Sequence, residues 1–338
     1  MLTAFMTGLS GPVITADECA FLTDSRPAGL ILFARNCQSP DQIRKLVAGF
    51  REAVGTERVL VLIDQEGGRV QRLRPPLGSL LPAAASFLGY ASGDVVEAAR
   101  LARLAARLAA HELSGYGINT NCAPVLDVPV AGAHDVIGNR AYAHDAATVT
   151  ALGTAVADGL MAGAIVPVAK HVPGHGRAGA DSHLELPVVA TPREILAATD
   201  FLPFRTLAHL PAAMTAHVVY TALDPARPAS ISASVTRGII RGEIGFDGLL
   251  MSDDLGMRAL AGSFESRTRA VLTAGSDLAL HCSGALPEMQ AVASAAPALA
   301  GESLRRFERA LRVALAPPMP FDAEAARAAL APLLARAA

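Results

Sequence analysis

The stretch with the densest chemistry is KHVPGHGRAGADSH, which follows a short apolar run at residues 164–169. It carries five side chains that exchange protons or bind polar ligands, spaced by glycines: Lys170, His171, His175, Asp181 and His183. An aspartate two residues from a histidine can accept its ring N–H, which fixes the tautomer and raises the basicity of the ring. Asp181 and His183 therefore predict a proton-transferring pair. We expect His175 to hold the loop by hydrogen bonds, and an ordinary polar surface loop is the alternative interpretation.

A second reactive group follows another apolar run, in the segment MSDDL. Asp253 could attack an electrophilic carbon, bind a metal, or cap the next helix. One carboxylate nucleophile and one acid/base group are the minimum for glycoside transfer by double displacement. In that interpretation the histidine of the pair replaces the second carboxylic acid that such enzymes ordinarily use.

Further polar side chains lie in loops that follow apolar runs and suit a substrate rich in hydroxyl groups. Carboxylates accept hydrogen bonds from hydroxyls, whereas arginine and lysine donate to them. The candidate binding residues are Asp64, Arg72, Arg140, Lys170 and His171. Each is weak evidence alone, because charged loop residues are usually solvated.

Short apolar runs alternate with helical patterns along the whole chain, and about seven such strands can be placed. They lie at residues 29–33, 59–63, 118–125, 164–169, 211–215, 248–251 and 277–280. Continuous apolar strands between helices predict a parallel sheet that is buried on both faces. Polar residues recur at the strands' carboxyl ends, namely Asp64, Asp127, Lys170, His217, Asp253 and His281. Since a barrel brings those ends together on one face, we predict an α/β fold with a single (β/α)8 TIM-like barrel.

No strong linker divides the chain, so we expect one catalytic domain spanning residues 1–338. A doubly wound open sheet is the alternative architecture. The helical patterns at residues 232–244 and 266–274 fit either arrangement.

Composition narrows the range of partners. Apolar residues make up 51% of the chain, charged residues 18%, and the formal net charge is −2 with no long run of one sign. This balance favours a small-molecule substrate over nucleic acid or a membrane. The four cysteines are scattered without a CxxC motif and predict reduced, buried thiols rather than disulfides or a metal site. The N-terminus has no basic segment ahead of an apolar one, so we expect a cytoplasmic protein. We also expect a monomer that uses no cofactor.

Four motifs together resemble the glycoside hydrolase family 3 β-N-acetylhexosaminidases: IDQEGGRVQRL, VIGNRAY, KHVPGHG with DSH four residues later, and MSDDLGM. The resemblance runs from GLILFARN to AGSDLAL and so covers nearly the whole chain. It implies a (β/α)8-like barrel and points to the compact, single-domain bacterial branch. Val172 stands where the family usually has Phe, and Ala141-Tyr142 where Ser-Phe is usual, which leaves fine specificity open.

By this resemblance Asp253 is the nucleophile, and His183 is the general acid/base oriented by Asp181. The five candidate binding residues hold the N-acetylglucosamine ring. The implied activity is retaining exo-hydrolysis of terminal β-linked N-acetylglucosamine, with 1,6-anhydro-muropeptides of peptidoglycan recycling as the natural substrate.

Three other functions stay open on the sequence alone. A phosphorylase could transfer the same sugar to phosphate, because a histidine acid/base does not repel an anion as a carboxylate does. A metal-dependent hydrolase could use His171, His175 and His183 with Asp181, although their spacing does not match a helix-borne HExxH pair. A non-catalytic sugar-binding protein would keep the hydroxyl-binding groups but would have no need of the Asp-His pair.

Overall fold

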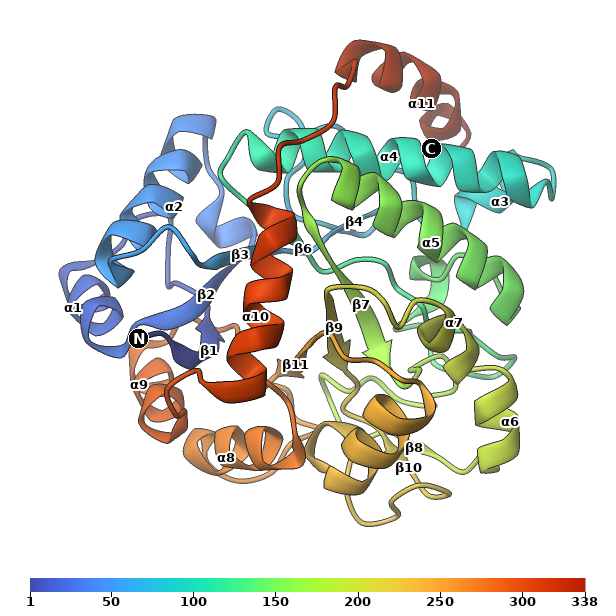
Figure 1. Ribbon diagram of the computed structural model, residues 1–338. Coiled ribbons are helices and arrows are strands. Elements are labelled where there is room, and N and C mark those ends of the chain that lie inside the picture. The colour runs from blue at the N-terminus through green and yellow to red at the C-terminus, as the bar shows by residue number, and fades with distance from the viewer. Residues whose placement is uncertain (338) are drawn as a thin grey trace.

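The computed structural model describes residues 1–337, which form a closed barrel of eight parallel strands surrounded by helices (Figure 1). The barrel strands are β1 (Thr3–Thr7), β2 (Pro27–Leu32), β3 (Leu60–Ile63), β6 (Thr120–Asn121), β7 (Val166–Val172), β9 (Ala212–Thr215), β11 (Leu249–Asp254) and β12 (Leu278–His281). Each strand pairs with the next barrel strand along the chain, and β12 closes on β1 with Phe5 opposite Ala279. The predicted (β/α)8 barrel is confirmed, and the doubly wound alternative is wrong.

The remaining elements lie outside the barrel wall. The helices are α1 (Ala16–Ser25), α2 (Pro40–Val54), α3 (Ser86–Tyr90), α4 (Val95–Ser114), α5 (Ala146–Ala162), α6 (Arg193–Ala198), α7 (Phe201–Thr206), α8 (Phe264–Ala274), α9 (Leu286–Ala295), α10 (Gly301–Ala314) and α11 (Ala323–Ala337). Short 3₁₀ turns are η1 (Ala34–Asn36), η2 (Gly138–Arg140) and η3 (Ala229–Ile231), and η4 (Val235–Glu243) is a π-helix. Two small sheets pair β4 (Gln65–Gly67) with β5 (Val70–Gln71) and β8 (Val188–Val189) with β10 (Val219–Tyr220). Within residues 1–337, no helix combines the length and apolarity needed to cross a membrane.

The strand that sequence patterns did not reveal is β1. Its five residues, TAFMT, begin and end in threonine, so the apolar signal is only three residues long. Pairing with β2 on one side and β12 on the other makes it a strand. The pairing with β12 joins segments far apart in the chain, and local propensity does not register such a contact.

The predicted helix at residues 232–244 is present but is wound as a π-helix over Val235–Glu243. Its buried apolar residues are Val235, Ile239, Ile240 and Ile244. These repeat every four to five residues, which is wider than the 3.6-residue turn of an α-helix. The wider i→i+5 turn therefore keeps all of them on the buried side, with the N–H of Ile244 donating to the carbonyl of Ile239 at 2.8 Å.

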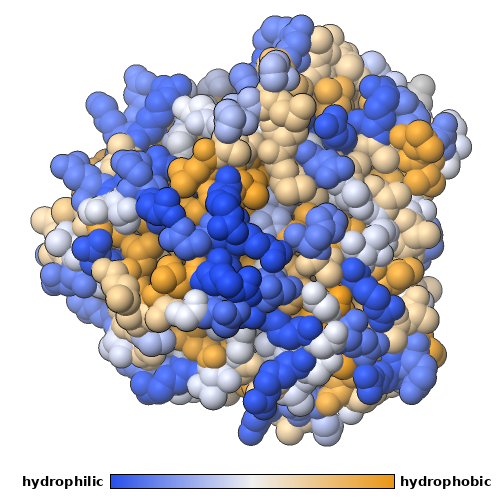
Figure 2. Space-filling view, viewed as in Figure 1, coloured by the Kyte–Doolittle hydropathy of each residue, from blue (hydrophilic) through white to orange (hydrophobic). Residues whose placement is uncertain are grey.

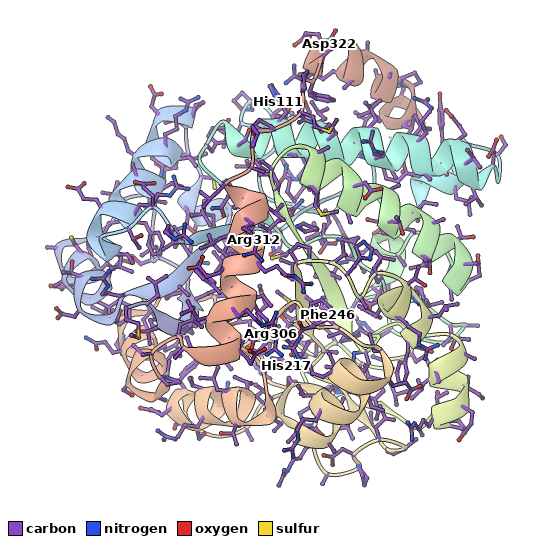
Figure 3. The ribbon with its side chains drawn as sticks, viewed as in Figure 1. His111, His217, Phe246, Arg306, Arg312 and Asp322 are labelled. Carbon is purple, nitrogen blue, oxygen red and sulfur yellow. The ribbon has the colours of Figure 1, made fainter. Side chains whose placement is uncertain are left out.

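Helix α10 covers the amino ends of the strands. Its Phe307 and Leu311 share one apolar cluster with strand-starting residues such as Leu60, and Figure 1 shows it lying across the front of the barrel. Viewed from the same side, hydrophilic side chains gather over this helix (Figure 2). Arg306, labelled on α10 in Figure 3, bonds to Asp247 at 3.0 Å and to Asp277 at 3.1 Å, which fastens the helix to the strand ends. With this end closed, the opposite end is left for ligands.

Among residues 1–337 all four cysteines are free thiols. Cys122 and Cys282 are buried and Cys37 is partly buried, as expected. Cys19 is exposed, contrary to expectation, because it lies on the outer face of α1.

Candidate active site

A cavity of about 250 Å³ opens at the carboxyl ends of the strands. Seven of the eight predicted site residues line it: Asp64, Arg72, Arg140, Lys170, His171, His183 and Asp253. The eighth, Asp181, lies directly behind His183. The volume is at the small end for ligand pockets, so it suits a single compact ring rather than a long chain.

The floor of the cavity is an ion-paired cluster around Asp64. Its carboxylate accepts from Lys170 Nζ at 2.9 Å and from Arg72 Nη2 at 3.0 Å. Burial alone would raise the pKa of Asp64, but the two cations lower it well below its usual range, so the carboxylate stays ionised. Arg72 lines the cavity, and its Nε is buried with no hydrogen-bond partner among residues 1–337.

Glu66 is a member of this cluster that the sequence analysis missed. It accepts two parallel bonds from Arg140, at 2.9 Å from Nε and 2.8 Å from Nη2, and lies 2.5 Å from Lys170 Nζ. Both carboxylates therefore hold the same lysine. Asp64 and Glu66 stand two residues apart in an extended segment, where alternate side chains share a face. That spacing is the signal that could have identified Glu66.

Asp127 organises the histidines on the next wall. Its Oδ2 lies 2.7 Å from His171 Nδ1, and its Oδ1 accepts the backbone N–H groups of His171 at 3.2 Å and His175 at 2.6 Å. Burial alone would raise the pKa of Asp127, but His171 and His175 lower it to about 2. The sequence placed Asp127 at a strand end without a role. In the structure it fixes the ring orientation of His171 inside the cavity.

His175 joins this wall to the loop that carries the Asp-His pair. Burial lowers the pKa of His175 to about 4, so its ring is neutral near neutral pH. Its Nε2 lies 3.2 Å from the hydroxyl of Ser182, which stands between Asp181 and His183. The predicted loop-holding hydrogen bond of His175 is therefore present.

Asp253 lies near the end of β11 and faces the cavity. Burial alone would raise the pKa of Asp253, but His171, His217 and the backbone N–H of Asp254 lower it, so the carboxylate is held ionised. The adjacent Asp254 instead accepts the N–H groups of Gly256 and Cys282 and so fixes the loop. The helix-capping alternative for Asp253 is wrong, because the following helix α8 is capped by Ser263.

Asp181 and His183 form the predicted pair at the rim. One carboxylate oxygen of Asp181 accepts the backbone N–H of His183 at 2.9 Å and lies 2.8 Å from its Nδ1. The Nε2 edge is thereby left for proton exchange, because Nδ1 carries the hydrogen that Asp181 accepts. Burial alone would raise the pKa of Asp181, but these bonds lower it. The side chain of His183 is 64% exposed.

The other strand-end histidines have structural partners. His217 lies 2.7 Å from the hydroxyl of Ser230 through Nδ1, and its Nε2 is 3.0 Å from the carbonyl of Asp254. His281 lies outside the cavity lining, with Nε2 3.0 Å from Glu288. In the described residues, no three histidine, cysteine or acidic side chains converge on a point that could hold a metal ion.

The three residues that depart from the resembling family are buried and lie outside the cavity lining. Val172 is buried at the end of β7, and Ala141 and Tyr142 are buried beneath the loop that carries Arg140. They act on the site through packing.

Comparison with known proteins gives consistent results. The model described as the glycosyl hydrolase family 3 N terminal domain matches residues 7–314. A β-hexosaminidase of Alkalilimnicola ehrlichii is 40% identical over 286 residues, which cover 83% of this chain and 81% of that protein. NagZ of Neisseria gonorrhoeae, solved in complex with N-trifluoroacetyl-D-glucosamine, is 31% identical with a TM-score of 0.83, covering 99% of this chain and 96% of that one. A glycoside hydrolase family 3 β-N-acetylglucosaminidase of Paenibacillus sp. is 31% identical with a TM-score of 0.84, covering 94% of this chain and 63% of that one.

Proposed function

The chain belongs to glycoside hydrolase family 3 as a glycosidase of the β-hexosaminidase type, and on this premise we propose that it removes terminal β-linked N-acetylglucosamine with retention of configuration. The observation that carries the mechanism is the presence of Asp253 and His183 in one cavity with the ion-paired floor. A carboxylate held ionised and a histidine fixed by Asp181 match the two roles of a double displacement.

The floor residues bind the sugar in this proposal. Lys170 is anchored by Asp64 and Glu66 and Arg140 by Glu66, and both cations keep further N–H groups for hydroxyls of the ring. Asp64 accepts hydrogen bonds from two neighbouring hydroxyls of the ring, and Arg72, which also lines the cavity, donates through its guanidinium group. His171, fixed by Asp127, donates or accepts through Nε2. Because this end of the cavity is filled by charged side chains, only a chain end enters, which gives exo action.

In the first step a carboxylate oxygen of Asp253 attacks C1 of the sugar. The bond from C1 to the leaving oxygen breaks, and that oxygen takes the proton from His183 Nε2. The products of the step are a glycosyl ester on Asp253, the free aglycone and a neutral His183. The lowered pKa of Asp253 keeps the nucleophile ionised until it attacks C1.

In the second step His183 removes a proton from water as the water attacks C1. The ester bond to Asp253 breaks, and the sugar leaves with β configuration. Asp181 stabilises the protonated ring of His183 and keeps its tautomer, so it acts without touching the sugar. The acetamido group is recognised but does not act as the nucleophile.

The proposed biological setting is based on the resemblance of the four motifs to the compact branch of the family. We propose 1,6-anhydro-muropeptides as the natural substrate, released during peptidoglycan recycling in the cytoplasm. The protein acts as a monomer, with residues 1–338 forming one catalytic domain that needs no metal or other cofactor. Transfer of the sugar to phosphate is the competing outcome.

Trapping with a 2-fluoro sugar donor followed by peptide mapping tests the proposal. The label is expected on Asp253. A label on another residue, or no label while turnover continues, contradicts the assignment. Release of p-nitrophenol from p-nitrophenyl N-acetyl-β-glucosaminide tests catalysis itself, and product analysis with and without phosphate separates hydrolysis from phosphorolysis.

A further inference from the structure

The segment that carries the Asp-His pair is thinly attached to the barrel. Asp181 and His183 both belong to residues 179–186, and the ring of His183 is 64% exposed. Asp181 sets the rotation of the ring, but it moves with the same segment. The position of His183 over the cavity must therefore depend on contacts between this segment and the rest of the protein.

Within residues 1–337, three hydrogen bonds make that connection. The N–H of Ala259 donates to the carbonyl of Ser182 at 3.3 Å, and the N–H of Arg258 donates to the carbonyl of His183 at 3.5 Å. Both are long for backbone hydrogen bonds. The third joins the hydroxyl of Ser182 to His175 Nε2 at 3.2 Å. It is the one contact of the three that involves side chains.

The side-chain contact is also the one that reaches the cavity wall. Ser182 and His175 are each 3% exposed, so water does not compete for their hydrogen bond. The backbone of His175 is held by Asp127, and its ring lies 5.6 Å from the ring of His171, centroid to centroid. A continuous set of contacts thus runs from the proposed sugar-binding His171 to the residue beside His183.

We propose that Ser182 and His175 are positioning residues whose hydrogen bond holds His183 at the leaving-group oxygen. This inference rests on the proposed function, because it takes His183 as the acid/base. Neither residue transfers a proton to the substrate. Their contribution is to keep the segment at the distance where proton transfer from His183 is effective.

Leaving-group dependence distinguishes this role from a general structural one. A dinitrophenyl leaving group departs without protonation, whereas a methyl or sugar leaving group needs the acid. For the Ser182→Ala variant, kcat/KM is expected to fall about tenfold or more on methyl N-acetyl-β-glucosaminide and to stay within about twofold on the 2,4-dinitrophenyl glycoside. His175→Gln places an amide nitrogen near the position of Nε2 and is expected to retain more activity on the methyl glycoside than His175→Leu.

Ser276→Ala is the matched control. Ser276 is also a buried serine, but its hydroxyl has no hydrogen-bond partner within residues 1–337, and it lies outside the cavity lining. Ser276→Ala is expected to leave kcat/KM unchanged on both the methyl and the 2,4-dinitrophenyl glycoside. Equal losses of Ser182→Ala on both glycosides, or no loss on either, would overturn the inference. Labelling of Asp253 by the 2-fluoro donor in Ser182→Ala keeps the two proposals separable, because a label elsewhere refutes the proposed function instead.

Discussion

Glu66→Gln probes the ion-paired floor with almost no change in shape. The side chain of Glu66 is 7% exposed and faces two cations, Arg140 and Lys170. The substitution removes the negative charge and replaces one acceptor oxygen by an amide NH₂ group. Whichever way the amide is turned, this NH₂ group faces another hydrogen-bond donor, on Arg140 or Lys170. Arg140 loses its carboxylate partner, whereas Lys170 keeps Asp64.

The size of the effect follows from those contacts. Removing one partner of a buried ion pair typically destabilises a protein by about 3–5 kcal/mol. Lys170 retains its bond to Asp64 at 2.9 Å, so we expect the lower end of this range. A loss of about 2–3 kcal/mol in the free energy of sugar binding corresponds to a fall in kcat/KM of about 30- to 150-fold. Since these donors hold hydroxyls in the ground state and the transition state alike, most of the change should be a rise in KM.

The assay is steady-state hydrolysis of p-nitrophenyl N-acetyl-β-glucosaminide, with inhibition by N-acetylglucosamine and urea unfolding measured alongside. Glu112→Gln is the control, because Glu112 is 10% exposed, pairs with Arg327 at 3.0 Å and lies outside the catalytic cavity. It should lose stability while kcat/KM stays within about twofold. A folded Glu66→Gln enzyme with kcat/KM within threefold of the native value, on the order of 0.6 kcal/mol, would refute the assigned role of Glu66.

Three further outcomes are expected. Asp181→Ala should lower kcat by about a hundredfold with little change in the affinity for N-acetylglucosamine, because Asp181 contacts His183 rather than the cavity; weakened binding at a normal turnover rate would contradict this. Gly176→Ala should destabilise the fold by about 1–3 kcal/mol or more in urea unfolding, since its Cβ would lie 2.1 Å from the carbonyl oxygen of Val128. Gly179→Ala has open space and should be neutral; equal effects of the two would contradict the geometry. Burial lowers the pKa of His175 from 6.5 to about 4. Between these two pH values the unfolded chain binds a proton that the folded protein does not bind. The free energy of unfolding therefore falls as the pH drops from 6.5 to about 4, by up to about 3 kcal/mol. His175→Gln should flatten the pH dependence of unfolding there, and an unchanged slope would show that another group is responsible.

Local sequence patterns predict much of the architecture. Seven of the eight barrel strands were predicted, and six of them stand out as apolar runs because a parallel strand covered on both faces needs apolar side chains. The seventh, β6, consists only of Thr120 and Asn121 and was found within the strand-like stretch 118–125. The eighth, β1, shows only three apolar residues between threonines. Its partners β2 and β12 come from opposite ends of the chain, and closure of the barrel defines it as a strand. The winding of η4 likewise depends on which residues the neighbouring layers bury.

In the candidate site, too, some features could be predicted from the sequence and others could not. Strand-end positions predicted that Asp253 and Lys170 lie on one face of the barrel, and the spacing of Asp181 and His183 predicted that they pair. The sequence alone could not show that Lys170 is shared by Asp64, 106 residues away, and by Glu66. Nor could it show that Ser182 links the segment that carries His183 to the cavity wall.

The sequence by itself thus determined the fold class and which chemical groups stand at the strand ends. Only the tertiary structure decided which of those groups meet, which carboxylates remain ionised and which residues hold the others in place. The physical reason is that ion pairing, desolvation and hydrogen bonding act over a few ångströms in space. Barrel closure, rather than spacing along the chain, sets those distances. At the KHVPGHGRAGADSH segment, closure places Lys170 on the ion-paired floor and His183 at the rim of the same cavity.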